Sequence, residues 1–220
     1  MPIPSSGREE GFRVTIGRDS HDEALNQAWA RLAGANPVIL AANSGATLKP
    51  DTSQLLLRVL DSECVVDIGS RTIAYSRGAS DEVSPHLKVL LLHYLEGSGN
   101  AQLANRLVTY RDFEGGALYY SAFKSRTIDV IVKEFGQRPD LLKHLGAAIR
   151  AESLTMGSVS FKAYFFPKMP IVVVLWVGDE EVPASANLLF DANAGRILPT
   201  EDISVMGGLL CSRLVKLERA

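Results

Sequence analysis

Residues 166–191 read FPKMPIVVVLWVGDEEVPASANLLFD, in which an apolar run leads through Gly178 to three consecutive carboxylates. Residues 171–177 are apolar at every position, so both faces of a strand would be apolar, which predicts a place in the middle of a sheet. Residues 186–190 form a second predicted strand beyond a connecting turn. The stretch therefore predicts a central strand that delivers an acidic corner, Asp179, Glu180 and Glu181, to the surface.

Further strand patterns lie on both sides of this stretch. Residues 159–165 alternate apolar and polar side chains, as a half-buried strand does. Nearer the N-terminus, two hairpin-length gaps at residues 61–63 and 69–70 separate three apolar segments, which predicts an antiparallel meander. Its strands are expected at residues 54–60, 64–68 and 71–76. Other short strands are expected at residues 12–16, 37–42, 107–110 and 196–198.

A first helix is predicted from its cap and its apolar stripe. Ser20 and Glu23 have the spacing of a capping box, in which each side chain satisfies a free backbone N–H. Gly34 and Pro37 end the helix. Its apolar residues recur at helical spacing and predict one core-facing stripe, with Trp29 as the anchor: Leu25, Ala28, Trp29 and Leu32.

Four more helices are predicted further along the chain. One begins at the Ser-Pro pair of residues 84–85, and because it is apolar nearly all round it should be central. Two others are expected at residues 118–135 and 139–149. The last helix has Thr200 as its predicted N-cap, and the glycine pair at residues 207–208 predicts a close approach to the sheet or a kink.

The order of these elements predicts the fold class. A helix, a meander, several helices, and then strands with a closing helix indicate an α+β fold with a largely antiparallel sheet. The N-terminal meander and the C-terminal strands would supply that sheet, packed with several helices. We expect residues 1–18 to form a flexible N-terminal arm and residues 19–220 to form a single domain, because no segment resembles a linker.

Composition excludes several classes of partner. The 220 residues are 46% apolar and 22% charged with a formal net charge of −2, and no basic run is interleaved with aromatic residues, so neither nucleic acid nor membrane is an expected partner. The N-terminus has no apolar signal segment, which predicts a soluble, cytoplasmic protein. Cys64 and Cys211 are interpreted as small buried residues that could pair only if the fold brought them together.

No familiar catalytic or cofactor motif is present. The sequence has no GxGxxG, P-loop, GxSxG or HExxH pattern and no cysteine ladder, so it carries neither a nucleotide nor an iron–sulfur motif, and its cofactor is unknown. The acidic corner remains, and Asp191 would join it if the hairpin folded that residue back. These carboxylates must be solvated, ion-paired or bound to a ligand, a partner or a hard cation, and the solvated turn carries the most weight.

Four other residues are candidates to complete a site at the acidic corner. Trp176 adjoins the corner as either a core residue or a pocket wall. His93, Arg111 and Arg126 are candidates to face it. His86 and His93 are about 10 Å apart along their helix, too far to bind one metal ion without further ligands, so His93 has either a structural or a site role.

The stretch FPKMPIVVVLWVGDEEVPASANLLFD resembles the signature of the domain-of-unknown-function family 3786, in which a W-x-G-D-E-E motif precedes an L-F-D motif. LLLHYLEG at residues 90–97 and VTYRDFEGG at residues 108–116 also fit, while Val182 replaces a frequent Phe. The resemblance implies no activity, because none is established for the family. Its occurrence in anaerobic bacteria and archaea implies a role in anaerobic metabolism. Some members carry a cysteine-rich iron–sulfur segment that this chain lacks, so no such cofactor is implied.

Two functions follow as hypotheses. The first is a non-catalytic module that binds a small ligand, a cofactor or a partner protein at the acidic corner. The alternative is a metal-assisted hydrolase or transferase that uses the same carboxylates, with His93 as the base. A third interpretation gives the acidic corner only a stabilising role in the fold.

Overall fold

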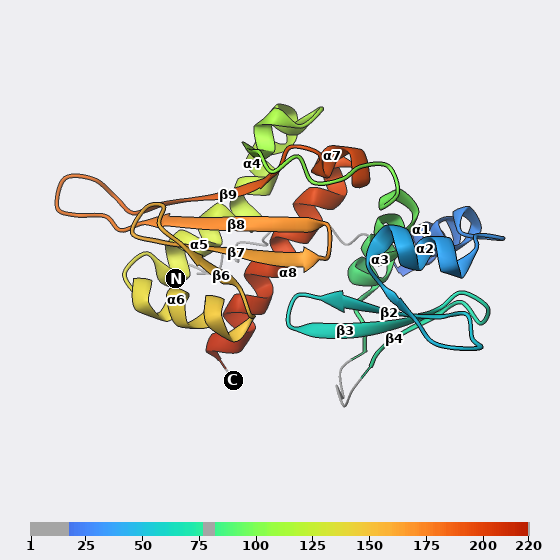
Figure 1. Cartoon of the computed structure of the whole chain (residues 1–220). Coiled ribbons are helices and arrows are strands. Elements are labelled where there is room, and N and C mark those ends of the chain that lie inside the picture. The colour runs from blue at the N-terminus through green and yellow to red at the C-terminus, as the bar shows by residue number, and fades with distance from the viewer. Residues whose placement is uncertain (1–17, 77–81, 220) are drawn as a thin grey trace, which may run out of the picture.

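The computed structural model describes residues 18–76 and 82–219, and it contains two antiparallel sheets held together by helices (Figure 1). One sheet has four strands in the order β1-β2-β3-β4, and the other has five in the order β5-β9-β8-β7-β6. The α+β class is confirmed. The meander and the C-terminal strands form two separate sheets. Of the arm predicted at residues 1–18, residues 1–17, with the predicted strand, lie outside the described residues, and Arg18 begins the first helix.

The four-stranded sheet is the predicted meander. Its strands are β1 (Thr47–Leu48), β2 (Gln54–Val59), β3 (Ser62–Asp67) and β4 (Thr72–Tyr75). The first turn lies one residue earlier than predicted, because Val59 pairs with Ser62 and leaves residues 60–61 as the turn. Leu60 is held there by burial and by its N–H, which donates to the carbonyl of Phe165 at 2.9 Å.

The five-stranded sheet contains the stretch around residue 171. Its strands are β5 (Leu107–Thr109), β6 (Glu152–Leu154), β7 (Val159–Phe166), β8 (Met169–Trp176) and β9 (Ser185–Asp191). The central position predicted for residues 171–177 is confirmed, because β8 lies between β9 and β7. Its valines at 172, 173 and 174 are at most 1% exposed, although they point alternately to the two faces.

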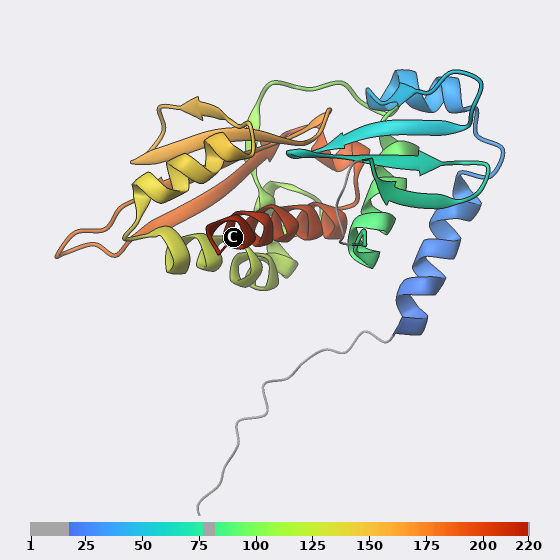
Figure 2. The ribbon, with the colours of Figure 1, turned by 90° about the horizontal axis from the view of Figure 1, so that it is seen from below.

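Helices cover one face of the five-stranded sheet (Figure 2). They are α4 (Gly116–Arg126), α5 (Ile128–Phe135), α6 (Pro139–Ala148) and α8 (Thr200–Glu218). The prediction of one helix over residues 118–135 is wrong, because the backbone of Thr127 leaves helical geometry (φ −129°, ψ −77°). The Thr127 hydroxyl donates to the carbonyl of Phe123 at 2.7 Å, a local bond that supports the break.

The closing helix α8 packs closely against its neighbours. A side chain at Gly207 would lie 3.2 Å from Thr127 Cγ2 and 3.4 Å from Leu188 Cδ2 of β9, so the predicted close approach is confirmed. Thr200 is not the N-cap, because the helix already includes it and Pro199 precedes it. The Thr200 hydroxyl instead donates to the carbonyl of Glu114 at 2.8 Å.

Three helical segments correct other predictions from the sequence. Residues 37–42 belong to α2 (Pro37–Ser44), in which Asn36 Oδ1 caps the N–H of Val38 at 2.9 Å and Gly45 ends the helix with φ 75°. Residues 196–198 overlap α7 (Ala194–Ile197) and are not a strand. The first helix, α1 (Arg18–Arg31), starts two residues before Ser20, so Ser20 lies in its first turn and is not its cap.

Helix α3 (Pro85–Gly97) is buried on most sides, so the central place that its all-round apolar pattern predicts is confirmed. It contacts α1, α2, α7 and α8. The ring of Tyr94 stacks on Phe166 of β7, with centroids 4.4 Å apart. Its hydroxyl donates to the carbonyl of Ser44 at 2.6 Å and accepts from the N–H of Lys168 at 3.2 Å. Because burial disfavours the phenolate, it raises the pKa of Tyr94. One continuous buried core results, shared by both sheets.

The two cysteines are buried in this core and are not bonded to each other. Burial raises the pKa of both Cys64 and Cys211 to about 12, so neither forms the reactive thiolate at neutral pH. Their interpretation as small buried residues is confirmed. Among the described residues, no helix has the length and apolarity needed to cross a bilayer.

Candidate functional site

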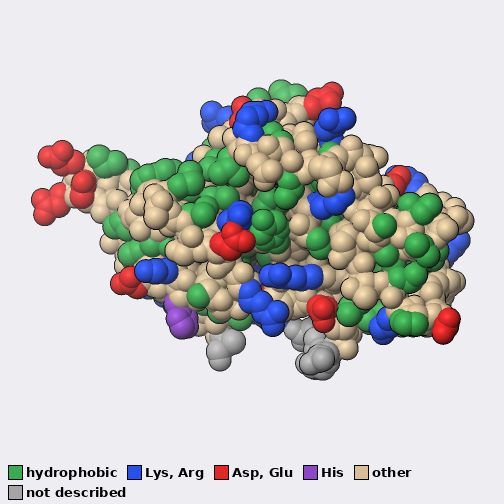
Figure 3. Space-filling model, in the orientation of Figure 1, with side chains coloured by type: hydrophobic (Ala, Val, Ile, Leu, Met, Phe, Trp, Pro, Cys, Tyr) green, Lys and Arg blue, Asp and Glu red, His purple; other side chains and the backbone are tan. Residues whose placement is uncertain are grey.

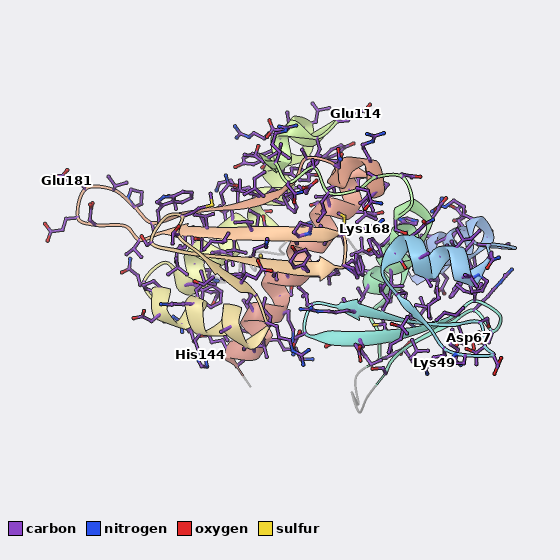
Figure 4. The ribbon with its side chains drawn as sticks, viewed as in Figure 1. Lys49, Asp67, Glu114, His144, Lys168 and Glu181 are labelled. Atoms are coloured by element: carbon purple, nitrogen blue, oxygen red, sulfur yellow. The ribbon has the colours of Figure 1, made fainter. Side chains whose placement is uncertain are left out.

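The acidic corner lies on the loop of residues 177–184 between β8 and β9, called the β8–β9 loop below. This loop extends beyond the end of the five-stranded sheet, with Glu181 on its outer part (Figure 4). In the space-filling view its carboxylates form an acidic tip at one end of the molecule (Figure 3). The corner is therefore a projection and not the wall of a pocket.

The carboxylate of Asp179 is committed to its own loop. Its Oδ1 accepts from the N–H of Glu181 at 2.9 Å and from that of Val182 at 2.8 Å, while the N–H of Asp179 donates to the carbonyl of Val182 at 2.9 Å. These backbone donors stabilise the charged form and lower the pKa of Asp179. Asp179 therefore shapes the turn in the manner of an Asx-turn.

The rest of the loop exposes both charged and apolar side chains. Glu180 and Glu181 are exposed, and neither forms a salt bridge with a residue that the structure describes. Trp176 is 42% exposed at the end of β8, and Val182 is 61% exposed. Trp176 is thus a surface residue beside the acidic tip and not a core residue.

Asp191 lies at the far end of β9 from the loop. The strand separates it from Ser185 by about 20 Å, at the usual rise of a strand. Its carboxylate is 3% exposed and accepts from the N–H groups of Ala104 at 2.9 Å, Asn105 at 2.8 Å and Asn193 at 2.9 Å. The hairpin does not fold Asp191 back to the acidic corner, and its carboxylate instead anchors the segment before β5.

His93 also lies away from the loop, on α3. Its Nδ1 is 2.6 Å from Asp202 Oδ2 of α8, and its Nε2 contacts the guanidinium of Arg31 on α1. The side chains of His93 and Asp202 are 19% and 15% exposed. Both ring nitrogens therefore have partners, and His93 links three helices.

Arg111 and Arg126 lie on another part of the surface. Arg111, in the single turn η1 (Tyr110–Asp112), places its guanidinium 3.7 Å from the centroid of the Tyr120 ring. Arg126 ends α4 and lies near His86, where burial, His21 and Arg126 lower the pKa of the imidazole. Neither arginine faces the β8–β9 loop. The structure keeps Trp176, Asp179, Glu180 and Glu181 together and separates His93, Arg111, Arg126 and Asp191 from them.

A concave site lies where the two sheets meet. This inter-sheet cleft has a volume of about 670 Å³. Its lining comes from the β2–β3 turn (residues 58–63), the end of β4, the start of α3, Phe165 of β7, Arg150 after α6, and one side of α8. The α8 residues are Leu209, Ser212, Arg213 and Lys216. Lys and Arg side chains gather on this part of the surface (Figure 3).

An ion pair closes one side of the cleft. Arg213 of α8 donates through Nε to Asp61 Oδ1 at 3.2 Å and through a terminal nitrogen to Oδ2 at 2.6 Å. This two-point geometry fixes α8 against the turn of the other sheet. The hydrogen bond that Arg213 donates to Asp61 raises the pKa of Arg213, so the guanidinium stays charged. The pair therefore sets the distance between two walls of the cleft.

Two lining residues have left-handed backbone conformations although neither is a glycine. Leu60 has φ 53° and Arg150 has φ 61°. Such conformations cost a side-chain-bearing residue free energy and persist where surrounding contacts enforce them. Burial of Leu60 and its hydrogen bond to Phe165 hold the backbone of Leu60 in this conformation. At Arg150 the backbone N–H donates to the carbonyl of Ala147 at 2.9 Å, which holds the chain there.

The cleft residues were not predicted from the sequence. Arg58, Asp61, Arg150 and Arg213 are far apart in the chain and belong to no motif. The only signal was indirect, because Asp61 falls in a predicted hairpin turn. Within the described ranges, no three His, Cys, Asp or Glu side chains are grouped closely enough to hold a metal ion.

Comparison with known proteins adds a family but no activity. No curated protein and no solved structure matches this sequence. The family model described as Domain of unknown function (DUF3786) matches residues 36–213. That range includes both sheets, the β8–β9 loop and every lining residue of the cleft named here except Lys216. The chain belongs to the family DUF3786.

Proposed function

We propose that this protein is a non-catalytic binding module that holds a small molecule in the inter-sheet cleft. One observation carries the proposal: a concave site of about 670 Å³ lies at the junction of the two sheets. That volume is in the range of small-molecule sites, which favour the boundaries between structural units. The role in anaerobic metabolism that the family resemblance implies remains a prediction.

The chemistry of the lining favours binding over catalysis. The described lining of the cleft includes no histidine and no cysteine. Of its two carboxylates, Asp61 is held by Arg213, and Glu63 is exposed. Among the lining residues that the structure describes, no general base is therefore positioned beside a nucleophile.

The experiment fills the cleft and asks whether binding is lost. Ser212 is an exposed residue of α8 that lines the cleft, so Ser212→Trp would occupy the site without disturbing the core. Ser125→Trp on α4 is the matched control, an exposed helical serine outside the lining. In a fragment screen followed by ligand-observed NMR, we expect hits that bind the wild type and Ser125→Trp but not Ser212→Trp. Hits that bind folded Ser212→Trp as well as wild type would contradict the proposal.

A partner protein at the β8–β9 loop is the second candidate function. The observation in its favour is that exposed apolar residues, Trp176 and Val182, adjoin an acidic tip without salt bridges to the described residues. A photo-crosslinking amino acid at Val182 should capture one discrete partner in the native host, and Glu180→Lys with Glu181→Lys should abolish the adduct. The same crosslinker at Leu118, which is 85% exposed, is the control. Equal adducts from both positions would argue against a specific partner.

The alternative of a metal-assisted hydrolase or transferase has less support. It needs His93 as a base beside the acidic corner, whereas His93 lies on α3 with both ring nitrogens engaged. Asp179 is also engaged by its own backbone. Retention of one metal ion per chain in the wild type and its loss in Asp179→Asn would revive this alternative.

A further inference from the structure

The charge of the inter-sheet cleft differs from that of the whole chain. The chain has a formal net charge of −2, but the described residues of the cleft lining include four cationic side chains and two carboxylates. One of those carboxylates, Asp61, is paired with Arg213. A concave surface with surplus positive charge concentrates anions, because the low-dielectric walls focus the field.

Two arginines in the lining form no ion pair with a carboxylate of the described residues, although Glu63 lies opposite Arg58 across the β2–β3 strand pair. The Nε of Arg58 donates to the carbonyl of Leu60 at 2.9 Å, and no salt bridge to this guanidinium forms within the described chain. For Arg150, neither a salt bridge nor a side-chain hydrogen bond joins it to the described residues. A guanidinium presents a planar fork of N–H donors that matches a carboxylate or phosphate.

The remainder of the lining includes an apolar part. Val59, Leu87, Phe165 and Leu209 come from both sheets and two helices. Val59, Leu87 and Phe165 are at most 7% exposed and form the floor of the cleft, whereas Leu209 is half-buried. Beside a free inorganic ion, Leu209 and the aliphatic stems of the lining Arg and Lys side chains would stay in contact with water. An organic molecule that carries an oxyanion satisfies both parts of the lining, since its apolar portion covers this aliphatic surface.

We infer that the ligand of the cleft is an organic molecule with a phosphate or carboxylate group, and that Arg150 and Arg58 bind this group. The inference rests on the proposed function and narrows its class of ligand. Arg58 belongs to β2 of the four-stranded sheet, and Arg150 follows α6, which packs on the five-stranded sheet. The oxyanion would therefore bridge these two halves of the molecule at the cleft. Binding of the ligand would thereby hold the halves together, since an added contact to both favours their joined arrangement.

Four small probes test the inference on the full chain. Phenyl phosphate is compared with phenol, and benzoate with benzamide, by NMR titration. We expect phenyl phosphate or benzoate to bind at least about tenfold more tightly than its neutral counterpart, a factor that corresponds to about 1.4 kcal/mol. The two pairs distinguish a phosphate ligand from a carboxylate ligand. Because ion pairs at a solvent-accessible site are screened, added salt should weaken only the charged probes.

Substitution of Arg150 supplies the matched comparison. Arg150→Gln should weaken the charged probe about tenfold and leave the neutral one unchanged. Arg71→Gln is the control, because Arg71 is also an exposed arginine with a left-handed backbone (φ 54°) but does not line the cleft. It should change neither probe, and melting temperatures establish that both variants are folded.

The outcomes separate the inference from the proposed function. If each neutral probe binds as tightly as its charged counterpart, and Ser212→Trp abolishes this binding, the inference is wrong and the cleft remains a binding site. If no charged probe binds the wild type, or Arg150→Gln and Arg71→Gln act alike, the inference is also wrong. The proposed function fails separately, through fragment hits that persist in Ser212→Trp.

Discussion

The β8–β9 loop and the inter-sheet cleft are opposite kinds of polar region. The loop has three consecutive carboxylates in the sequence, yet in the structure it projects into solvent, and its Asp179 bonds to its own backbone. The cleft has no motif, yet it gathers charged and apolar side chains from six segments around one cavity. A cluster of charged residues in the sequence therefore need not form a site in the structure. A ligand site needs side chains that the fold brings together around one cavity.

The two regions also differ in what holds them. Contacts within three residues fix the loop around Asp179, so its shape depends little on the rest of the fold. The cleft depends on contacts between distant elements, such as the Asp61–Arg213 pair, which is separated by 152 positions. A change in the global packing should therefore affect the cleft before the loop.

The largest expected effect comes from breaking the ion pair of the cleft. Asp61→Ala leaves Arg213 without its two-point partner in a partly buried position, where the exposures of the two side chains are 15% and 34%. We expect a loss of about 2 kcal/mol in the free energy of unfolding, a typical cost for charged hydrogen bonds. Asp129→Ala is the control, because its pair with Lys124 is about half exposed and should contribute below about 0.5 kcal/mol. Urea denaturation of both variants measures the difference, and equal losses would remove the distinction between long-range and local contacts.

A smaller effect is expected from the left-handed arginines. Arg150→Gly and Arg71→Gly both relieve a strained backbone, and each should raise the free energy of unfolding by about 0.5 kcal/mol, since the entropy that glycine loses on folding offsets part of the gain. Only Arg150→Gly should weaken phenyl phosphate. Thermal unfolding and the same NMR titration measure both quantities. A loss of binding in Arg71→Gly would mean that the cleft responds to remote backbone changes.

The smallest effect concerns the loop carboxylate. The pKa of Asp179 is lowered in the folded protein, so its contribution to stability is fully present above its unfolded pKa, near pH 4, and is lost as the pH falls through the folded pKa. Asp179→Asn should accelerate amide exchange at Glu181 and Val182 without changing exchange at the cleft. Hydrogen-exchange NMR of wild type and variant measures this local effect. Faster exchange throughout both sheets would show that the loop supports the whole fold.

A second carboxylate offers a check on this titration behaviour. Asp67 accepts from the side chains of Ser53 and Gln54 and from the N–H groups of Gly69 and Ser70, and these bonds lower its pKa to about 2. In a carboxyl-detected NMR experiment, Asp67 should titrate below the ordinary range of an aspartate, and Ser53→Ala should raise the pKa of Asp67. An unchanged pKa in that variant would contradict the role assigned to the Ser53 hydroxyl.

The sequence predicted those parts of the fold whose patterns are self-contained. The run at residues 171–177 and the all-round apolar helix at Pro85–Gly97 are both central, because a segment apolar on every side must be enclosed. Errors arose where a short pattern fits two structures. Residues 37–42 read as a strand, but Asn36 and Gly45 cap them as a helix, and the break at Thr127 has no proline or glycine to mark it.

The site was less predictable than the fold for a physical reason. Asp179, Glu180 and Glu181 are adjacent in the chain, and adjacency made them visible before the structure was known. Arg58 and Arg150 line the same cleft only because the two sheets pack together. The N–H of Leu60, in the β2–β3 turn of one sheet, donates to the carbonyl of Phe165 in β7 of the other sheet. The way in which distant elements pack together is a tertiary property, and no local sequence pattern encodes it.

The most direct test of the cleft as the ligand site is an amide chemical-shift map of the ¹⁵N-labelled protein titrated with phenyl phosphate. We expect saturable shifts at residues 58–63, at Arg150 and at residues 209–216, with none at residues 179–182. Saturable shifts confined to residues 177–184 would contradict this assignment and would place the binding site on the β8–β9 loop.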